Sequence, residues 1–188
     1  MSGLGLILPP TPMLGAASGD FVSANGTGIF TTGNLAAISI AAANKLFVTP
    51  RRVDGVERYD RIVVEATAGG TSSKCRAGCF ANVNGRPGAL LLDSGDIDLS
   101  STAIVSTTID LTLANCWVWD FILFNNTAAT VRGVSSAAAS RIPHLTSGLT
   151  SSNYGNLEAA HAYGPAPATC PTVSQGDTRW FRVEYRIV

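Results

Sequence analysis

The stretch that most constrains the fold spans residues 76–98, with the sequence RAGCFANVNGRPGALLLDSGDID. Two short apolar runs in it are separated by turn residues, among them an Asn84-Gly85 step and Pro87. Asn-Gly supplies the positive φ angles of tight hairpins, and proline fixes φ while removing a backbone donor. A second group of turn residues, 93–96, follows the second run. The stretch predicts strand, loop, strand and turn, and it carries no catalytic motif.

Alternation of apolar and polar residues extends this β pattern along the chain. Period-2 alternation is the signature of a half-buried strand, and it is clear in residues 103–113 and 179–188. Residues 116–124 are apolar on both faces, which is typical of a central strand covered on both sides. Asp120 within that run needs a hydroxyl or arginine partner, or a place at the rim of the sheet. The expected strands are 46–49, 59–66, 75–80, 89–92, 103–113, 116–124, 129–134 and 179–188.

Short strands at roughly ten-residue spacing, with turn residues between them, predict an all-β protein. We expect a jelly-roll-like antiparallel β-sandwich with an extended N-terminal arm. A chain of 188 residues allows one such domain. The expected division is an attachment arm at 1–44 and a sandwich at 45–188, with a long irregular loop at 135–176. Helix is expected to be minor, with 156–163 as the candidate for a turn or two.

The arm is defined by its composition. Residues 1–44 are rich in Gly, Pro, Ala, Ser and Thr, and Asp20 is the only charged residue before Lys45. A segment of this kind buries little of its own surface, so we expect it to pack on a sister chain or a larger assembly. The apolar residues assigned to that contact are Leu4, Leu6, Ile7, Leu8, Phe21, Ile29 and Phe30.

The long loop gathers aromatic residues. A loop of this length is uncommon in a compact domain and is usually functional or packed on a partner. One hypothesis is a sugar-binding surface, because aromatic rings can meet the apolar faces of sugars. The other, which we favour, is that the rings pack the loop onto its own sheet or onto a neighbour. The residues concerned are Tyr154, His161, Tyr163 and Trp180.

Four cysteines raise the question of a disulfide or a metal site. On one strand Cys75 and Cys79 would lie about 13 Å apart, too far to bond each other, but they share a face and can meet Cys116. We expect buried free thiols, with one disulfide or a metal as the alternatives. The cysteines and histidines are scattered, unlike the paired ligands of a zinc site, so no metal and no cofactor are expected. The acidic turn residues Asp93, Asp96 and Asp98 lack the spacing of a calcium loop.

Several functional classes have no support in the sequence. Zero formal net charge and 14% charged residues argue against a nucleic-acid partner. No apolar run approaches about 18 residues and the N-terminus lacks a positive region, so neither membrane insertion nor a secretory signal is expected. G-x-S-x-G, H-E-x-x-H and phosphate-loop motifs are absent, so we expect no catalytic residues and no enzyme. Pairing Glu158 with Asp120 or Asp177 as glycosidase carboxylates would rest on abundance alone.

From residue 45 onward, the segments KLFVTPRRV, YDRIVVEAT, NGRPGALLLDSG, TTIDLTLANCWVWDFIL and RWFRVEYRIV follow one another. This order resembles a β-sandwich (jelly-roll-like) module of structural proteins in tailed-bacteriophage virions. Residues 85–90 match the family's "G-x-PG-AL" hairpin signature. Residues 114–117 depart from its second signature, "L-x-PG-x-YW", because the Pro-Gly is replaced. The resemblance covers about residues 45–188 and leaves 1–44 unmatched.

The resemblance implies a non-enzymatic virion component of the fibre, spike or capsid-decoration type. It implies attachment to other capsid or tail proteins through residues 1–44, and a homo-oligomer, with a trimer favoured. Assembly in the bacterial host cytoplasm would fit free thiols. One alternative is a receptor-binding module whose partner is a host cell-surface glycan. The other is an enzyme that degrades cell-wall polysaccharide.

Overall fold

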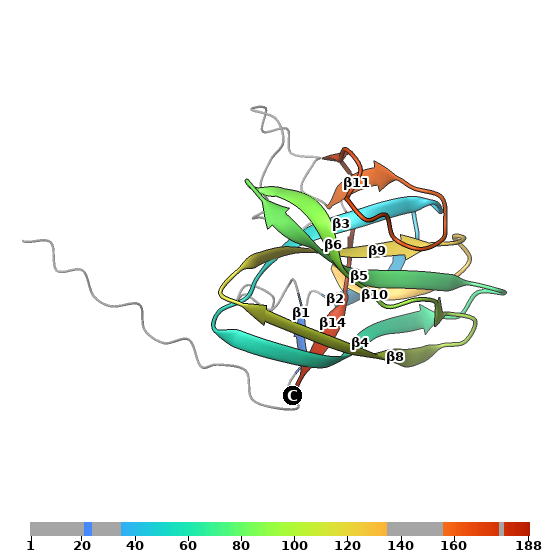
Figure 1. The fold of residues 1–188 in the computed structure, drawn as a ribbon. Coiled ribbons are helices and arrows are strands. Elements are labelled where there is room, and N and C mark those ends of the chain that lie inside the picture. Colours follow the sequence, from blue (N-terminus) through green and yellow to red (C-terminus); the bar gives the residue numbers. More distant parts are fainter. Residues whose placement is uncertain (1–20, 24–34, 135–155, 177–178) are drawn as a thin grey trace, which may run out of the picture.

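The computed structural model describes residues 21–23, 35–134, 156–176 and 179–188. In this part of the chain every regular element is a β-strand, and the strands form two antiparallel sheets that pack face to face (Figure 1). The predicted fold class, an all-β antiparallel sandwich, is confirmed.

The first sheet is built around a long strand, β4 (Val56–Ala68). One edge of β4 pairs with β8 over most of its length, and the other edge pairs first with β14 and then with β10. β10 also pairs with β2 and β13, and β1 pairs with β14. The other strands of this sheet are β1 (Phe21–Ser23), β2 (Leu35–Ser39), β8 (Ala103–Ala114), β10 (Thr130–Val134), β13 (Trp180–Phe181) and β14 (Glu184–Ile187).

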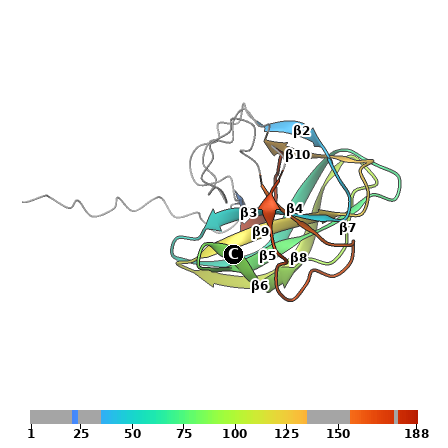
Figure 2. The same ribbon diagram turned by 90° about the horizontal axis from the view of Figure 1, so that it is seen from above.

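The second sheet has the strand order β12-β11-β3-β9-β5-β6, and the short β7 pairs with β5. Figure 2 shows β2 and β10 of the first sheet on the opposite side of the molecule from β6 of the second. The strands of the second sheet are β3 (Lys45–Arg52), β5 (Lys74–Val83), β6 (Arg86–Asp93), β7 (Ile97–Asp98), β9 (Trp117–Phe124), β11 (Leu157–Ala160) and β12 (Ser174–Gln175).

The predicted hairpin at 76–98 is confirmed. β5 and β6 pair through Val83↔Arg86, which leaves a two-residue turn at Asn84 and Gly85. Both turn residues have positive φ, 51° and 77°. This is the geometry of the favoured two-residue hairpin turn, and the Asn-Gly step supplies it at low cost. After β6 the chain turns again at Gly95, which has φ 74°.

The first strand is longer than the predicted 46–49, because β3 continues through Pro50 to Arg52. β9 pairs with β3 from Leu46 to Arg52, whereas β11 pairs with the other edge only from Lys45 to Val48. Pro50 thus lies where one edge of β3 has no strand partner among the described residues, a position that tolerates a missing N–H. The helical turn expected at 156–163 is also wrong, since residues 157–160 form β11.

The main hydrophobic core lies between the two sheets and is rich in aromatic rings. Phe181 from the first sheet packs edge-on against Phe47 and Phe124 from the second, at centroid distances of 4.8 and 5.0 Å. The predicted C-terminal alternation is confirmed, because every second residue from 181 to 187 is buried. Cys75 and Cys79 lie in this core as free, buried thiols, and Cys116 packs against it. Burial raises the pKa of the Cys75 and Cys79 thiols well above the ordinary value.

A second hydrophobic cluster covers the outer face of the second sheet. Residues 161–173, which follow β11 and are called the strap below, supply its cover (orange in Figure 1). The strap reaches β6 at the opposite edge, where the Leu90 amide donates to the Ala168 carbonyl and the Cys170 amide donates to the Gly88 carbonyl, both at 2.9 Å. From Val118 to Phe124, β9 is therefore covered on both faces, as its sequence predicts. The members of the cluster are Leu46, Val48, Phe80, Trp119, Phe121, Leu123, Leu157, Ala159 and Ala166, with Leu90, Tyr163, Cys170 and Val173 packed against it.

Part of the expected arm belongs to the sandwich. β2 adds five residues to the edge of β10, and Ile38 and Ile40 are buried in the main core. Phe21 also lies in a strand, paired with Arg186. Uncharged, Ala-rich composition made residues 35–44 look like the rest of the arm, but Ile38 and Ile40 are core residues and Ala36 packs against the core. The other predicted arm contacts, Leu4, Leu6, Ile7, Leu8, Ile29 and Phe30, lie outside the described residues, as do residues 135–155 of the predicted loop.

Candidate functional site

The structure does not bring the predicted aromatic set to one surface. Tyr154 lies outside the described residues. Trp180 is in β13 of the first sheet with only 6% of its surface exposed. Tyr163 is in the strap on the second sheet, where its ring packs on the outer cluster and its hydroxyl donates to Asp96 at 3.1 Å. Nearby, His161 Nε2 lies 3.1 Å from the Pro165 carbonyl oxygen. The described rings thus pack on the fold itself.

The carboxylates considered as a catalytic pair have structural partners. Asp120 is bound to Arg51, and Glu158 lies 2.9 Å from the Lys45 ammonium. Asp177 lies outside the described residues. The described residues contain no group of three or more His, Cys, Asp or Glu side chains placed to hold a metal ion.

The acidic turn after β6 is held by basic residues. Arg76 binds Asp93 at 2.9 Å and Asp96 at 2.8 Å. Lys74 reaches Asp96 as well, and Asp98 accepts hydrogen bonds from Ser100. Asp96 lies in the turn, as predicted, whereas Asp93 is the last residue of β6 and Asp98 the last of β7.

Asp120 and Arg51 form an ion pair inside the sandwich. Arg51 Nε donates to Asp120 Oδ2 at 2.8 Å, and Arg51 Nη2 donates to Asp120 Oδ1 at 3.3 Å. Arg51 Nη1 donates to the Tyr59 hydroxyl at 2.8 Å, and the guanidinium stacks over the Tyr185 ring at 4.4 Å. The Tyr185 hydroxyl donates to the Gly78 carbonyl at 3.1 Å. The network therefore ties β3, β9, β4, β14 and β5 together across both sheets.

The electrostatics of this pair favour a structural role. Burial raises the pKa of Asp120, and the Arg51 guanidinium opposes that shift. Burial by itself lowers the pKa of Arg51, but the charge and hydrogen bond of Asp120 together with the neighbouring Tyr185 and Tyr59 outweigh it, and the net shift is upward. We take the ionised pair as the form at neutral pH, because arginine keeps its proton in proteins and the geometry satisfies both charges.

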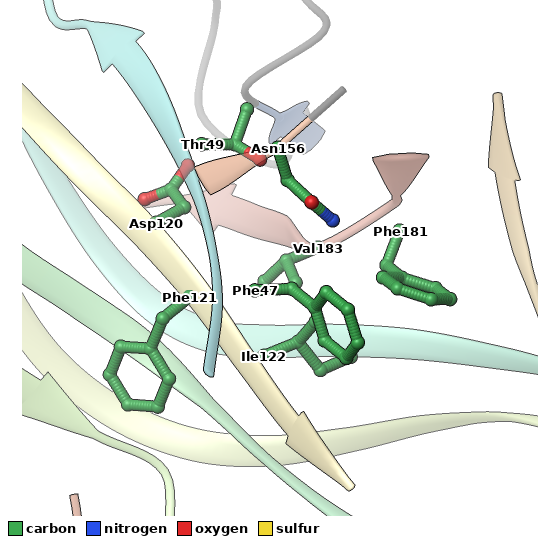
Figure 3. A pocket seen from close by; sticks show the side chains of 8 residues that line it. All are labelled: Phe47, Thr49, Asp120, Phe121, Ile122, Asn156, Phe181 and Val183. Carbon is green, nitrogen blue, oxygen red and sulfur yellow. The ribbon is translucent and has the colours of Figure 1, made fainter. Parts of the chain in front are cut away.

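A small cavity lies beside this pair (Figure 3). Its volume is about 10 Å³, which is room for about one water molecule. Figure 3 shows Thr49, Asp120 and Asn156 gathered on one side and the rings of Phe47 and Phe181 close together on the other. Asn156 Oδ1 is buried and has no hydrogen-bond partner among the described residues, while Asn156 Nδ2 donates to the Arg179 carbonyl at 2.8 Å. A space this small excludes a substrate or cofactor.

An open pocket of about 200 Å³ lies at the other end of β9. It is lined by Pro50, Asn82, Gly85, Trp117 and Trp119. Trp119 is 2% exposed, whereas Trp117 at the start of the same strand is 49% exposed. The sequence predicts that the whole strand is covered, so the prediction is wrong for Trp117. The one sequence signal for the exposure of Trp117 is the position of this residue at the strand end, next to the turn at Asn115.

Among the described strands, β8 has a partner on one edge only. This strand has 12 residues and pairs only with β4 among the described residues. Its residues alternate between exposed and half-buried, and Val105, Ile109 and Leu111 pack against the main core as half-buried side chains. Ile104 on the outward face is 72% exposed. A long edge strand of this kind presents unpaired backbone groups that another chain can pair with.

Within the described residues, no helix has the length and apolarity needed to cross a bilayer. No protein-family model matches the chain, and no curated protein matches it. The resemblance of residues 45–188 to the bacteriophage module therefore stays a prediction that rests on the motifs in the sequence.

Proposed function

We propose that this chain is a non-enzymatic structural subunit of a tailed-phage virion, displayed on the particle surface as part of a fibre, a spike or a capsid decoration. The observation that carries the proposal is the edge of β8 that no described strand pairs with. Virion proteins act as many copies side by side, and a long free edge strand is a place where one copy can add to the next. The hairpin signature at 85–90 supports the virion assignment by resemblance.

The side-chain chemistry is in keeping with a scaffold. The carboxylates that a polysaccharide-degrading enzyme would use are paired with basic residues, Asp120 with Arg51 and Glu158 with Lys45. Asp120 is also buried beside a cavity of about 10 Å³. The receptor-binding alternative based on the loop aromatics loses Trp180, whose ring is buried in the first sheet. Neither rival gains a site from these residues.

The edge contact is tested by the oligomeric state. Ile104 and Thr108 are exposed on the outward face of β8, so Ile104→Lys with Thr108→Lys adds charge to the edge without touching the core. In sedimentation velocity we expect the unmodified chain to form a homo-oligomer, with a trimer favoured, and the double variant to be monomeric. Leu91→Lys, at an exposed position on β6, is the matched control and should stay oligomeric. A monomeric unmodified chain at micromolar to millimolar concentration, or an oligomeric double variant, would overturn the proposed contact.

Virion membership is tested on particles. Density-purified particles from a culture that produces the chain should contain its peptides in a fixed ratio to the main capsid protein. If the peptides are found only in the soluble lysate, the chain is not a virion component.

Attachment through the arm needs a deletion that spares the sandwich. Because residues 21–23 and 35–39 form strands, the deletion should remove only residues 1–20. We expect that chain to fold and to be missing from particles. Its normal incorporation would show that residues 1–20 are not the anchor.

A further inference from the structure

The pocket at Trp117 has the features of a ligand site, and neither the ion-pair network nor the edge strand uses it. We propose that it binds one pyranose ring of a neutral carbohydrate. The proposal concerns binding alone, so it stands or falls independently of virion membership.

The floor of the pocket is rigid. It is the end of the outer face of the second sheet that no described residue of the strap covers. There Pro50 and Trp119 are directly opposite each other in β3 and β9. Trp119 is buried in the outer cluster, and on its other side it faces Phe80 of β5. The lining residues therefore come from three paired strands and one tight turn, so the pocket is formed before any ligand arrives.

Asn82 supplies an oriented donor. The indole Nε1 of Trp119 can only donate, and it lies 2.9 Å from Asn82 Oδ1. The Asn82 amide oxygen must face Trp119, so Nδ2 points away from Trp119 and is available to donate a hydrogen bond to a ligand. Nδ2 makes no hydrogen bond to any described residue. The hydrogen bond to Trp119 thus fixes both the position of the Asn82 side chain and which end of its amide group faces the pocket.

Trp117 supplies an exposed aromatic ring. The Arg52 guanidinium stands 6.0 Å from the ring centroid, and Arg52 Nε donates to Asp54 Oδ1 at 3.0 Å. Even with Arg52 in place, 49% of Trp117 is exposed. Arg52 is partnered by Asp54, and none of the five residues that line the pocket is charged, so the site favours a neutral ligand.

Size and chemistry then select the ligand class. Pockets for drug-sized molecules start at about 300 Å³, so about 200 Å³ suits a single ring. A pyranose has an apolar C–H face for the indole and a rim of hydroxyl groups for Asn82 Nδ2 and the Arg52–Asp54 pair. A nucleotide would also stack on tryptophan, but its phosphate needs unpaired basic groups. The proline-rich residues 9–12 of this chain are the other occupant that an aromatic groove can take, and the experiment separates the two.

The experiment titrates the full chain with methyl glycosides of glucose, galactose and N-acetylglucosamine at millimolar concentrations. Binding is followed by saturation-transfer NMR, and the protection of Trp117 from acrylamide quenching is followed by fluorescence. We expect at least one glycoside to bind with a millimolar Kd and to protect Trp117. Trp117→Ala should weaken binding by at least about tenfold. Trp117 is half-exposed, so that variant should fold, and its Tm is measured to check this.

Asn82→Asp gives an independent test of the oriented amide. It keeps the acceptor for Trp119 and replaces the Nδ2 donor with a charged oxygen that can only accept. A sugar oxygen that accepts from Nδ2 then loses its donor, so binding should weaken while Trp119 stays buried. Val188→Ala, at an exposed position after β14 in the other sheet, is the control and should bind as the unmodified chain does. The proposal is overturned if no glycoside protects Trp117, if Trp117→Ala binds equally well, or if a peptide of residues 1–20 binds the pocket and the glycosides do not.

Discussion

Asp120→Asn is the substitution that tests the sandwich most directly. Arg51 and Asp120 are 69 residues apart in the sequence, yet their side chains are only 2% and 3% exposed and are joined by two hydrogen bonds. Asparagine keeps the shape of the side chain and one acceptor but leaves the Arg51 charge buried without a counter-charge. Breaking a buried pair in this way costs about 3–5 kcal/mol. For a chain of 188 residues this corresponds to a fall in Tm of about 6–20 °C.

Guanidinium unfolding followed by tryptophan fluorescence measures the change, and calorimetry gives Tm. Asp110→Asn is the matched control, because Asp110 and its partner Arg58 are 76% and 63% exposed. An exposed pair of this kind contributes less than about 1 kcal/mol, so the control should barely move.

Replacing both partners, as Arg51→Met with Asp120→Leu, should recover most of the stability lost by Asp120→Asn, since no unpaired charge remains. A cost of less than about 1 kcal/mol for Asp120→Asn, no more than for an exposed pair, would contradict a stabilising role for the buried ion pair. A double variant less stable than Asp120→Asn would contradict it as well.

Three further outcomes follow from the same structure. Gly78→Ala should be strongly destabilising, because the added Cβ would lie 2.0 Å from the Leu92 carbonyl oxygen. The Cβ of Gly85→Ala meets nothing within 4 Å, so that substitution should cost only about 1 kcal/mol for its positive φ. Equal effects of the two substitutions in denaturant unfolding would contradict this packing. The Cys75 and Cys79 thiols should not react with Ellman's reagent at pH 8 until the chain unfolds, because burial raises their pKa, and fast reaction in the native state would place them outside the core. Hydrogen bonds from Arg132 lower the pKa of Glu65, so its contribution to stability is present above the unfolded pKa of about 4.3 and is lost as the pH falls through the lower folded value. Glu65→Gln should therefore flatten the pH dependence of unfolding below that pH, and an unchanged slope would remove Glu65 from the acid response.

The strands and the hairpin could be predicted because their signals are local. The turn at Asn84 and Gly85 follows from the φ preferences of two adjacent residues. The alternation in residues 103–113 and 179–188 needs only the two-residue period of a strand. The doubly apolar run at 116–124 likewise indicated cover on both faces, and the strap provides it.

Other features depend on which strands become neighbours, and no local pattern contains that information. The sequence showed that Asp120 needs a partner, but only the pairing of β3 with β9 places Arg51 beside it. Residues 35–44 share the composition of the arm, and their place in the sandwich depends on the free edge of β10.

The proposed binding site at Trp117 likewise combines a feature with a local sequence signal and a feature that depends on tertiary packing. The sequence predicts that Trp117 and Trp119 share one face of a strand, because side chains alternate with a period of two. It does not predict that Trp119 is buried while Trp117 is half-exposed. Burial of that face depends on the strap packing over part of the sheet, and that packing joins residues far apart in the chain.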